Sequence, residues 1–341
     1  MSVPYQTIRL ERSGTIAHLI LQRPERLNAI DRRMLDELQD ALDAVERDNE
    51  LRVLVVKGAG GNFSSGFDLK EQMEARPSGP DAWREILNKD FSAVMRFWHL
   101  KKPTIAAVEG YCLAGGCELA LSCDMTIAAE DAIFGEPELK FGAGIVVMIL
   151  PWLVGPKRTK EIILTGADRI SAPEAARIGL INRVVPSDQL ESSVLALARR
   201  IAVIDPNLVQ QTKRAINQCF ETMGLVEALN AALDIDLAIE GKGSDDKRQF
   251  MEIARRDGLR KAIAWRDARF DGSPAKAATH VRFGSTAPEI IEASQRLISG
   301  SLQKRTQIRA YSAGREVPGS GHPDRNERRH VSGLRSLRRI C

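Results

Sequence analysis

The sequence predicts an α/β protein with parallel strands, followed by a segment that is helical only. Short apolar runs bounded by Gly or Pro alternate with helical periodicity over the first two-thirds of the chain. Strands that alternate with helices in this way are joined by crossovers, which are right-handed between parallel strands. From about residue 189 to residue 268 the apolar pattern is helical throughout, and the composition changes again near residue 272.

The first strands and the helix between them have clear sequence boundaries. Ile16–Leu21 is an apolar run that ends at Gln22-Arg23-Pro24, and Val53–Lys57 is a β-branched run that ends in a glycine-rich turn. Asp31 is placed to cap a helix from Arg32 to about Asp48, because apolar residues recur there at helical spacing. A strand, a helix and a second strand are therefore expected in this order.

The later elements follow the same reasoning. A helix is expected from Trp83 to about His99, because the pattern becomes helical after a loop with Pro and Gly. Short helices are expected after residue 151. The other strands and the helix of the α/β part are expected at Thr104–Val108, Gly115–Ser122 (the helix), Met125–Ala129 and Arg183–Val185. Amphipathic helices are expected at Leu190–Ile204, Pro206–Met223 and Leu225–Ile239.

Three regions are predicted from these patterns: a core at 1–188, a helical region at 189–271 and a basic tail at 272–341. The whole chain has a net charge of +4, but the tail alone has 13 Lys and Arg against 5 Asp and Glu. The tail is interpreted as mostly disordered, since it is rich in Gly, Ser, Pro and Arg. A nucleic-acid-binding arm is the alternative, which we do not favour because only Phe283 and Tyr311 interrupt the basic residues with aromatic rings.

Several classes of protein are excluded by composition. No run of eighteen apolar residues suggests a membrane span, and Met1–Gly14 lacks the apolar segment of a secretory signal. The five cysteines are not spaced as a disulfide framework or a zinc site, so we expect no metal and buried thiols in a reducing cytoplasm.

Two turns carry residues that can bind a ligand. They are Asn62–Glu71, after the second strand, and Val108–Ala120, after the third. Open α/β sheets place ligands at the carboxyl ends of parallel strands. Gly115-Gly116 opens a helix whose first N–H groups are unpaired, and two such donors aimed at one oxygen form an oxyanion hole. Tight packing explains the two glycines equally well at this stage.

Two glutamates are candidates for acid and base catalysis. Glu118 lies one turn into the helix that starts at Gly115, framed by Cys117 and Leu119, and Glu138 follows twenty residues later. A carboxyl group in apolar surroundings has a raised pKa, which suits proton transfer near neutral pH. The alternative is that each is a solvated surface residue, because the sequence does not show whether the two side chains converge.

Taken together, the motifs closely resemble the enoyl-CoA hydratase/isomerase (crotonase) superfamily. The resemblance covers about Ile16 to Phe270, and its markers in chain order are Arg23–Ala29, Phe63–Leu69, Gly110–Ala120, Phe134–Glu138, Leu164–Gly166 and Ala175–Leu180. It implies a crotonase-like spiral of ββα turns with a C-terminal helical trimerisation region, and homotrimers that often pair into homohexamers. It also implies a coenzyme A thioester as substrate, no separate cofactor, and a place in fatty acid or other lipid metabolism.

The resemblance assigns roles to individual residues. The backbone N–H groups of Phe67 and Gly115 match the oxyanion hole. Glu118 matches the residue that deprotonates water, and Glu138 the residue that protonates the α-carbon. The implied substrate-binding residues are Arg26, Ala29, Phe67, Asp68, Leu69 and Lys70. Because both glutamates are present, hydration of a 2-enoyl-CoA to a 3-hydroxyacyl-CoA is the expected reaction, catalysed by a lyase.

One stretch departs from the pattern of the hydratases. After Glu138 the chain reads Phe141-Gly142-Ala143-Gly144-Ile145-Val146-Val147-Met148, with bulky aliphatic residues where small ones are expected. Such side chains change the acyl pocket or exclude water. Isomerisation of the double bond and hydrolysis of the thioester therefore remain alternatives, and a non-catalytic acyl-CoA or RNA-binding protein is a more remote one.

Overall fold

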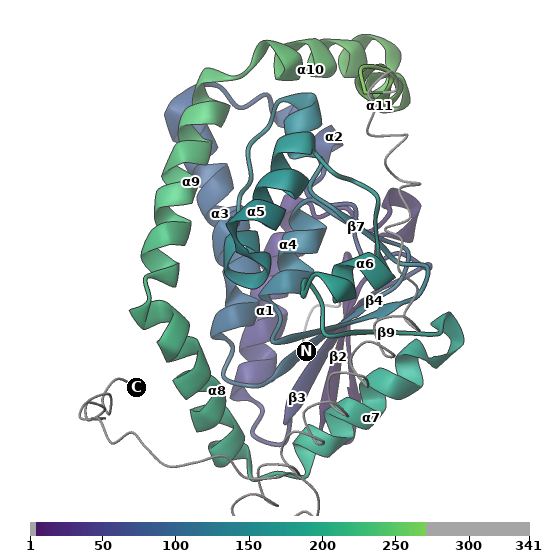
Figure 1. Ribbon diagram of the computed structural model, residues 1–341, viewed down its shortest axis with the longest axis vertical. Coiled ribbons are helices and arrows are strands. Elements are labelled where there is room, and N and C mark those ends of the chain that lie inside the picture. The colour runs from purple at the N-terminus through teal and green to yellow at the C-terminus, as the bar shows by residue number, and fades with distance from the viewer. Residues whose placement is uncertain (1–4, 271–341) are drawn as a thin grey trace, which may run out of the picture. The chain divides into compact units, whose positions relative to one another are not determined.

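Two sheets form the framework of the computed structural model, which describes residues 5–270 (Figure 1). The larger sheet has the strand order β1-β2-β3-β4-β6-β9, parallel except for the antiparallel pair β1 and β2. Its strands are β1 Ile8–Ser13, β2 Ile16–Leu21, β3 Val53–Gly58, β4 Thr104–Val108, β6 Met125–Ala129 and β9 Arg183–Val185. The smaller sheet, in the order β5-β7-β8, consists of Tyr111–Leu113, Ile133–Gly135 and Ile170–Ser171.

Consecutive strands are divided between the two sheets. β4 and β6 belong to the larger sheet, while the strands that directly follow them, β5 and β7, belong to the smaller one. A helix follows each such pair: α4 (Gly115–Ser122) after β5, and the 3₁₀ helix η2 (Glu138–Phe141) with α5 (Leu150–Thr165) after β7. The chain therefore repeats a unit of two strands and a helix.

Helices cover both faces of the larger sheet because its central strands bury side chains on both sides. Val53 and Val55 contact α7, whereas Leu54 and Val56 belong to the main core under α1, α3 and α4. The helices of this part are α1 Arg32–Arg47, α2 Leu69–Ala75, α3 Gly79–His99, α6 Ala172–Arg177 and α7 Leu190–Ala202, with the 3₁₀ helices η1 Pro24–Arg26 and η3 Ser187–Gln189.

The C-terminal part of the described chain is helical, as predicted. Its helices are α8 Pro206–Thr222, α9 Leu225–Lys242, α10 Asp245–Asp257 and α11 Leu259–Ala268. In Figure 1, α8 and α9 form one long edge of the molecule, and α9 packs along α3. α10 crosses above α2 and η2 and thereby covers the region where the predicted catalytic residues lie.

The structure confirms most of the predicted elements. Asp31 caps α1 by accepting a hydrogen bond from the Met34 N–H, and the seven strands and helices expected between residues 16 and 129 are present. α3 begins at Gly79 rather than Trp83, because Gly79-Pro80 forms its first turn. The stretch after residue 150 is a longer helix than expected, interrupted at Gly155 before Pro156. The tail predicted at 272–341 lies outside the described residues.

Four short strands were missed. β1 is an edge strand with mostly exposed side chains, and β5, β7 and β8 have two or three residues each, too few for a periodic pattern. Tyr111–Leu113 was read as part of a turn but pairs with Ile133–Gly135. Within residues 5–270, no helix has the length and apolar character that crossing a bilayer requires.

Candidate active site

The two glycine-containing turns predicted to bind a ligand meet in the structure. Gly66, with φ of +95°, brings its backbone against Ala114 and Gly115: a Cβ atom at Gly66 would lie 2.7 Å from the Ala114 Cβ and 3.1 Å from the Gly115 nitrogen. Hydrogen bonds from Ile30 N–H to the Gly66 carbonyl and from Asp68 N–H to the Ile30 carbonyl hold Phe67 in place. These contacts hold Phe67 and Gly115 next to each other.

Phe67 and Gly115 supply the two N–H groups of the predicted oxyanion hole. Neither N–H donates to a protein acceptor within residues 5–270. Gly115 is the first residue of α4, where the helix leaves its N–H groups unpaired. A side chain at this position is excluded, because a Cβ atom would lie 2.4 Å from the Phe67 ring.

The two predicted acids converge. Glu118 on α4 and Glu138 at the start of η2 are both buried, with exposed fractions of 0% and 7%. Carboxylate oxygens of Glu118, Glu136 and Glu138 lie within 4.8 Å of one another. The Val147 N–H donates to Glu118 Oε1 at 3.0 Å, while Glu118 Oε2 and Glu138 Oε2 have no protein partner among the described residues.

Burial controls the protonation of these acids. It raises the pKa of Glu118 well above its ordinary value, and the nearby charge of Glu138 raises that pKa further. Burial also raises the pKa of Glu138, to about 8. Carboxyl groups this close in a dry space cannot all ionise, so at neutral pH the group retains protons that can be transferred.

Comparisons with known proteins identify the family of the chain. A family model described as enoyl-CoA hydratase/isomerase matches residues 11–251. The chain belongs to the enoyl-CoA hydratase/isomerase family. A crystal structure of an enoyl-CoA hydratase/isomerase from Xanthobacter autotrophicus Py2 is 63% identical, with a TM-score of 0.78 over 79% of this chain and 100% of that one. The crotonase fold predicted from the sequence is thus confirmed.

Curated relatives are more distant in sequence. A crotonyl-CoA hydratase from Syntrophomonas wolfei is 35% identical over 277 residues, which are 78% of this chain and 98% of that protein. A short-chain-enoyl-CoA hydratase from Clostridium acetobutylicum is 38% identical over 215 residues, 61% of this chain and 80% of the other.

The residues predicted to bind substrate differ in exposure and in the contacts they make within the protein. Asp68 accepts hydrogen bonds from the first N–H groups of α2 and pairs with Arg23 at 2.9 Å, so its carboxylate already has partners. Lys70 is partly exposed and pairs with Glu74 at 3.7 Å. Leu69 is the first residue of α2, Arg26 is exposed at the end of η1, and Ala29 is buried. Their contacts with a coenzyme stay a prediction.

Glu136 is a residue of the site that the sequence reasoning missed. It is 1% exposed, and neither carboxylate oxygen has a partner among the described residues. Burial raises its pKa well above the ordinary value, and the charges of Cys117, Glu138 and Glu118 add to the effect. The sequence signal that identifies Glu136 as a candidate is its position two residues before Glu138 and directly after a strand. Carboxylates also suit hard cations, which makes this trio the candidate metal group of residues 5–270.

The aliphatic stretch after Glu138 packs into the core instead of lining an open pocket. Ile145, Val146 and Val147 are all buried in the main core. The backbone of the same stretch positions acids, because Val147 N–H donates to Glu118 and Gly144 N–H donates to Glu240 at 3.2 Å. Bulky side chains thus exclude water from the space around Glu118, while the Val147 N–H holds one of its carboxylate oxygens.

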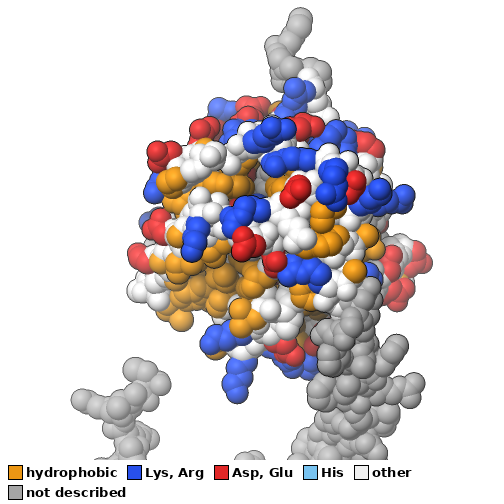
Figure 2. All heavy atoms as spheres, turned by 90° about the horizontal axis from the view of Figure 1, so that it is seen from above, with side chains coloured by type: hydrophobic (Ala, Val, Ile, Leu, Met, Phe, Trp, Pro, Cys, Tyr) orange, Lys and Arg blue, Asp and Glu red, His pale blue; other side chains and the backbone are white. Residues whose placement is uncertain are grey.

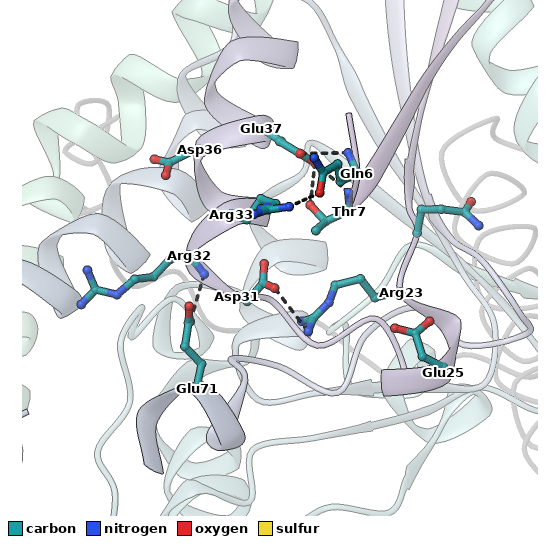
Figure 3. Close-up of a pocket in the computed structure, with 11 residues that line it drawn as sticks. Gln6, Thr7, Arg23, Glu25, Asp31, Arg32, Arg33, Asp36, Glu37 and Glu71 are labelled. Carbon is teal, nitrogen blue, oxygen red and sulfur yellow. Dashed lines mark hydrogen bonds and ion pairs between the residues drawn. The ribbon is translucent and has the colours of Figure 1, made fainter. Parts of the chain in front are cut away.

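A polar hollow of about 740 Å³ lies beside the start of α1 (Figure 3), and Arg23 in its wall pairs with the predicted substrate-binding residue Asp68 at 2.9 Å. Its charged groups satisfy one another: Arg23 pairs with Asp31, Glu37 accepts from Thr7, and Glu71 accepts from the Arg32 N–H. None of the predicted catalytic or substrate-binding residues lines it.

Proposed function

We propose that the protein adds water across the double bond of a 2-enoyl-CoA to give a 3-hydroxyacyl-CoA. The observation that carries the proposal is the pairing of two buried acids, Glu118 and Glu138, with oxygens within 4.8 Å, beside a turn that presents two free N–H groups. Relatives named crotonyl-CoA hydratase and short-chain-enoyl-CoA hydratase support the same reaction.

Each group has one task in the proposed reaction. The N–H groups of Phe67 and Gly115 donate to the thioester oxygen and stabilise the negative charge that develops there when water attacks the β-carbon. In the active state one of the two acids is ionised: ionised Glu118 takes the proton of the attacking water on Oε2, since Oε1 is held by Val147. Glu138, which its raised pKa keeps protonated near neutral pH, gives a proton to the α-carbon.

Isosteric substitution of the two acids tests the proposal. Glu118→Gln and Glu138→Gln should each reduce kcat for crotonyl-CoA by about 10²- to 10⁴-fold, because an amide cannot transfer the proton. Inhibition by butyryl-CoA, which cannot be hydrated, should remain close to that of the native protein. Glu130→Gln, at an exposed position, is the matched control. Full hydratase activity in both active-site variants would overturn the proposal.

Isomerisation of the double bond is the second candidate reaction. The observation in its favour is the buried Ile145–Val147 stretch, whose side chains dry the space beside Glu118. Isomerisation needs a proton transfer but no water. The mass of the product separates the candidates: hydration adds one water, isomerisation leaves the mass unchanged, and thioester hydrolysis releases free coenzyme A.

We also propose that the protein self-associates, as a trimer or a pair of trimers. α8 buries none of its residues in the described chain, although it is amphipathic. Large hydrophobic side chains are exposed on and beside it: Val203, Ile204, Leu208, Ile216 and Met223. Figure 2 views a different face, from the end where α10 lies in Figure 1, and shows hydrophobic side chains there among charges of both signs. Light scattering after size-exclusion chromatography measures the mass, and a monomer would contradict the proposal.

A further inference from the structure

The chain from residue 138 to residue 147 fixes both of the proposed catalytic acids. Glu138 is its first residue, and the N–H of its last residue, Val147, donates to Glu118 Oε1 at 3.0 Å. The Ala143 N–H donates to the Glu138 carbonyl at 3.1 Å and closes the turn after η2. This stretch therefore carries one acid and holds the other, so a shift of its main chain would change the distance between the two carboxyl groups.

Two helices from the end of the described chain hold the middle of this stretch through its main chain. Ser244, which caps α10, donates its hydroxyl to the Gly142 carbonyl at 2.9 Å. The Gly144 N–H donates to Glu240 Oε1, near the end of α9, at 3.2 Å. A Cβ atom at Gly142 would overlap Ser244 Oγ, and one at Gly144 would overlap Asp236 Oδ1. Glycine therefore allows α9 and α10 to approach a stretch that is otherwise bulky.

Glu240 is itself held in one position. The residue is 5% exposed, and its second carboxylate oxygen, Oε2, pairs with the ammonium group of Lys247 on α10. Lys247 is 7% exposed and lies over the Trp83 ring, 4.3 Å from the ring centroid. Both oxygens of Glu240 thus have a partner inside the protein, and the oxygen that faces Gly144 has little freedom to move.

Stability alone is a weak explanation for this buried ion pair. Burying two charges costs hydration, and apolar residues of similar volume often stabilise a protein equally well. Glu240 Oε1, however, accepts from a main-chain N–H three residues before Val147, whose own N–H holds Glu118. An apolar side chain at position 240 would fill the space but offer Gly144 no acceptor. The pair thus connects α9 and α10 to the stretch that fixes the acids.

We propose that Glu240 is a positioning residue, which keeps the two catalytic acids at their working distance by anchoring Gly144. This inference rests on the proposed function, because it takes Glu118 as the base and Glu138 as the acid. Glu240 acts on them through the main chain and transfers no proton itself. The N–H groups proposed to bind the thioester lie outside the anchored stretch, so loss of the anchor should lower kcat and leave KM nearly unchanged.

Two double variants test the anchor. Glu240→Gln with Lys247→Met keeps a side-chain oxygen that accepts from Gly144, whereas Glu240→Leu with Lys247→Met removes it. Both variants lose the whole ion pair, so neither leaves an unpaired charge in the interior, and they differ only at position 240. With crotonyl-CoA, kcat should be about ten- to hundredfold lower in the Leu variant than in the Gln variant, because small misplacements of reacting groups are costly. Equal kcat in the two variants overturns the inference and leaves the proposed function intact.

Hydrogen exchange measures the anchoring without any reaction. The main-chain amides of residues 144–147 should exchange about tenfold faster in the Leu variant than in the Gln variant, while those of β3 exchange alike in both. This result in a protein that hydrates no thioester would support the anchor although the proposed function fails, and equal exchange at 144–147 would overturn the anchor. If the Leu variant does not fold, Gly144→Ala replaces it, because its Cβ atom displaces the stretch from Asp236 and should produce the same slower turnover and faster exchange.

Discussion

Replacing Asp90 by Asn should make the protein more stable, by an amount that grows with pH. Burial is the main cause that raises the pKa of Asp90 from 3.8 to about 8. The charged groups that face it act in both directions: Arg32 on α1 and Lys89 on α3 lower the pKa, while Glu71 on α2 and Asp236 on α9 raise it. Desolvation therefore outweighs the two cations, and Asp90 stays protonated in the folded protein at neutral pH.

The number of protons bound by the folded and the unfolded chain decides whether stability rises or falls with pH. Between pH 4 and pH 8 the unfolded chain has released the Asp90 proton and the folded protein has kept it, so stability falls as the pH rises. Each pH unit in this window costs about 1.4 kcal/mol. The loss between pH 5 and pH 7 is then about 3 kcal/mol from this residue alone. Asparagine has no proton to release, so the variant should lack this part of the pH dependence.

Urea unfolding at pH 5, 6 and 7 measures the difference directly. The gain in unfolding free energy of Asp90→Asn over the native protein should rise by about 1.4 kcal/mol per pH unit, with an unchanged m-value. Asp81→Asn, at an exposed position of the same helix, should show no such rise. Unfolding curves that shift in parallel for the native protein and Asp90→Asn would refute the reasoning, because they would mean that Asp90 ionises equally in both states.

Four further predictions concern the catalytic centre. Because Glu138 must be protonated to act as the acid, kcat/KM should fall about tenfold per pH unit above its pKa of about 8; a flat profile to pH 10 contradicts this. Gly115→Ala forces a Cβ atom toward the Phe67 ring and should reduce kcat by about 10²-fold or more, measured with crotonyl-CoA. Glu136 lowers the pKa of Glu138, so Glu136→Leu should raise the upper pKa of the pH–rate profile, which remains fixed if Glu136 is uninvolved. Treatment with EDTA should leave the rate unchanged, whereas loss and recovery with Mg²⁺ would make the three glutamates a metal site.

The sequence predicted those parts of the fold in which a pattern is long enough to be read. β3, β4 and β6 are buried on both faces and appear as continuous apolar runs, and α1 has both a cap and a periodic apolar face. The strands of the smaller sheet have two or three residues each and are held by neighbours distant in sequence. No local pattern specifies such strands, so they were missed.

The sequence predicts a site residue that lies within a recognisable motif. It does not predict a residue whose place in the site depends on tertiary contacts. Glu118 and Glu138 lie in recognisable turns, and the structure brings them together. Asp90 and Asp236 lie on long amphipathic helices, where an acid is usually solvated. Their burial arises because α3 and α9 pack against each other, which no pattern within either helix shows.

The packing of α9 on α3 brings together stretches of the chain that are far apart in sequence. The N–H groups and acids proposed to act on the thioester lie between residues 67 and 138, whereas Asp236 lies on a helix about one hundred residues later in the chain. Substitutions in α9 can therefore change the protonation of the buried glutamates from a distant part of the chain, because the charge of Asp236 raises the pKa of Glu118 and of Glu138.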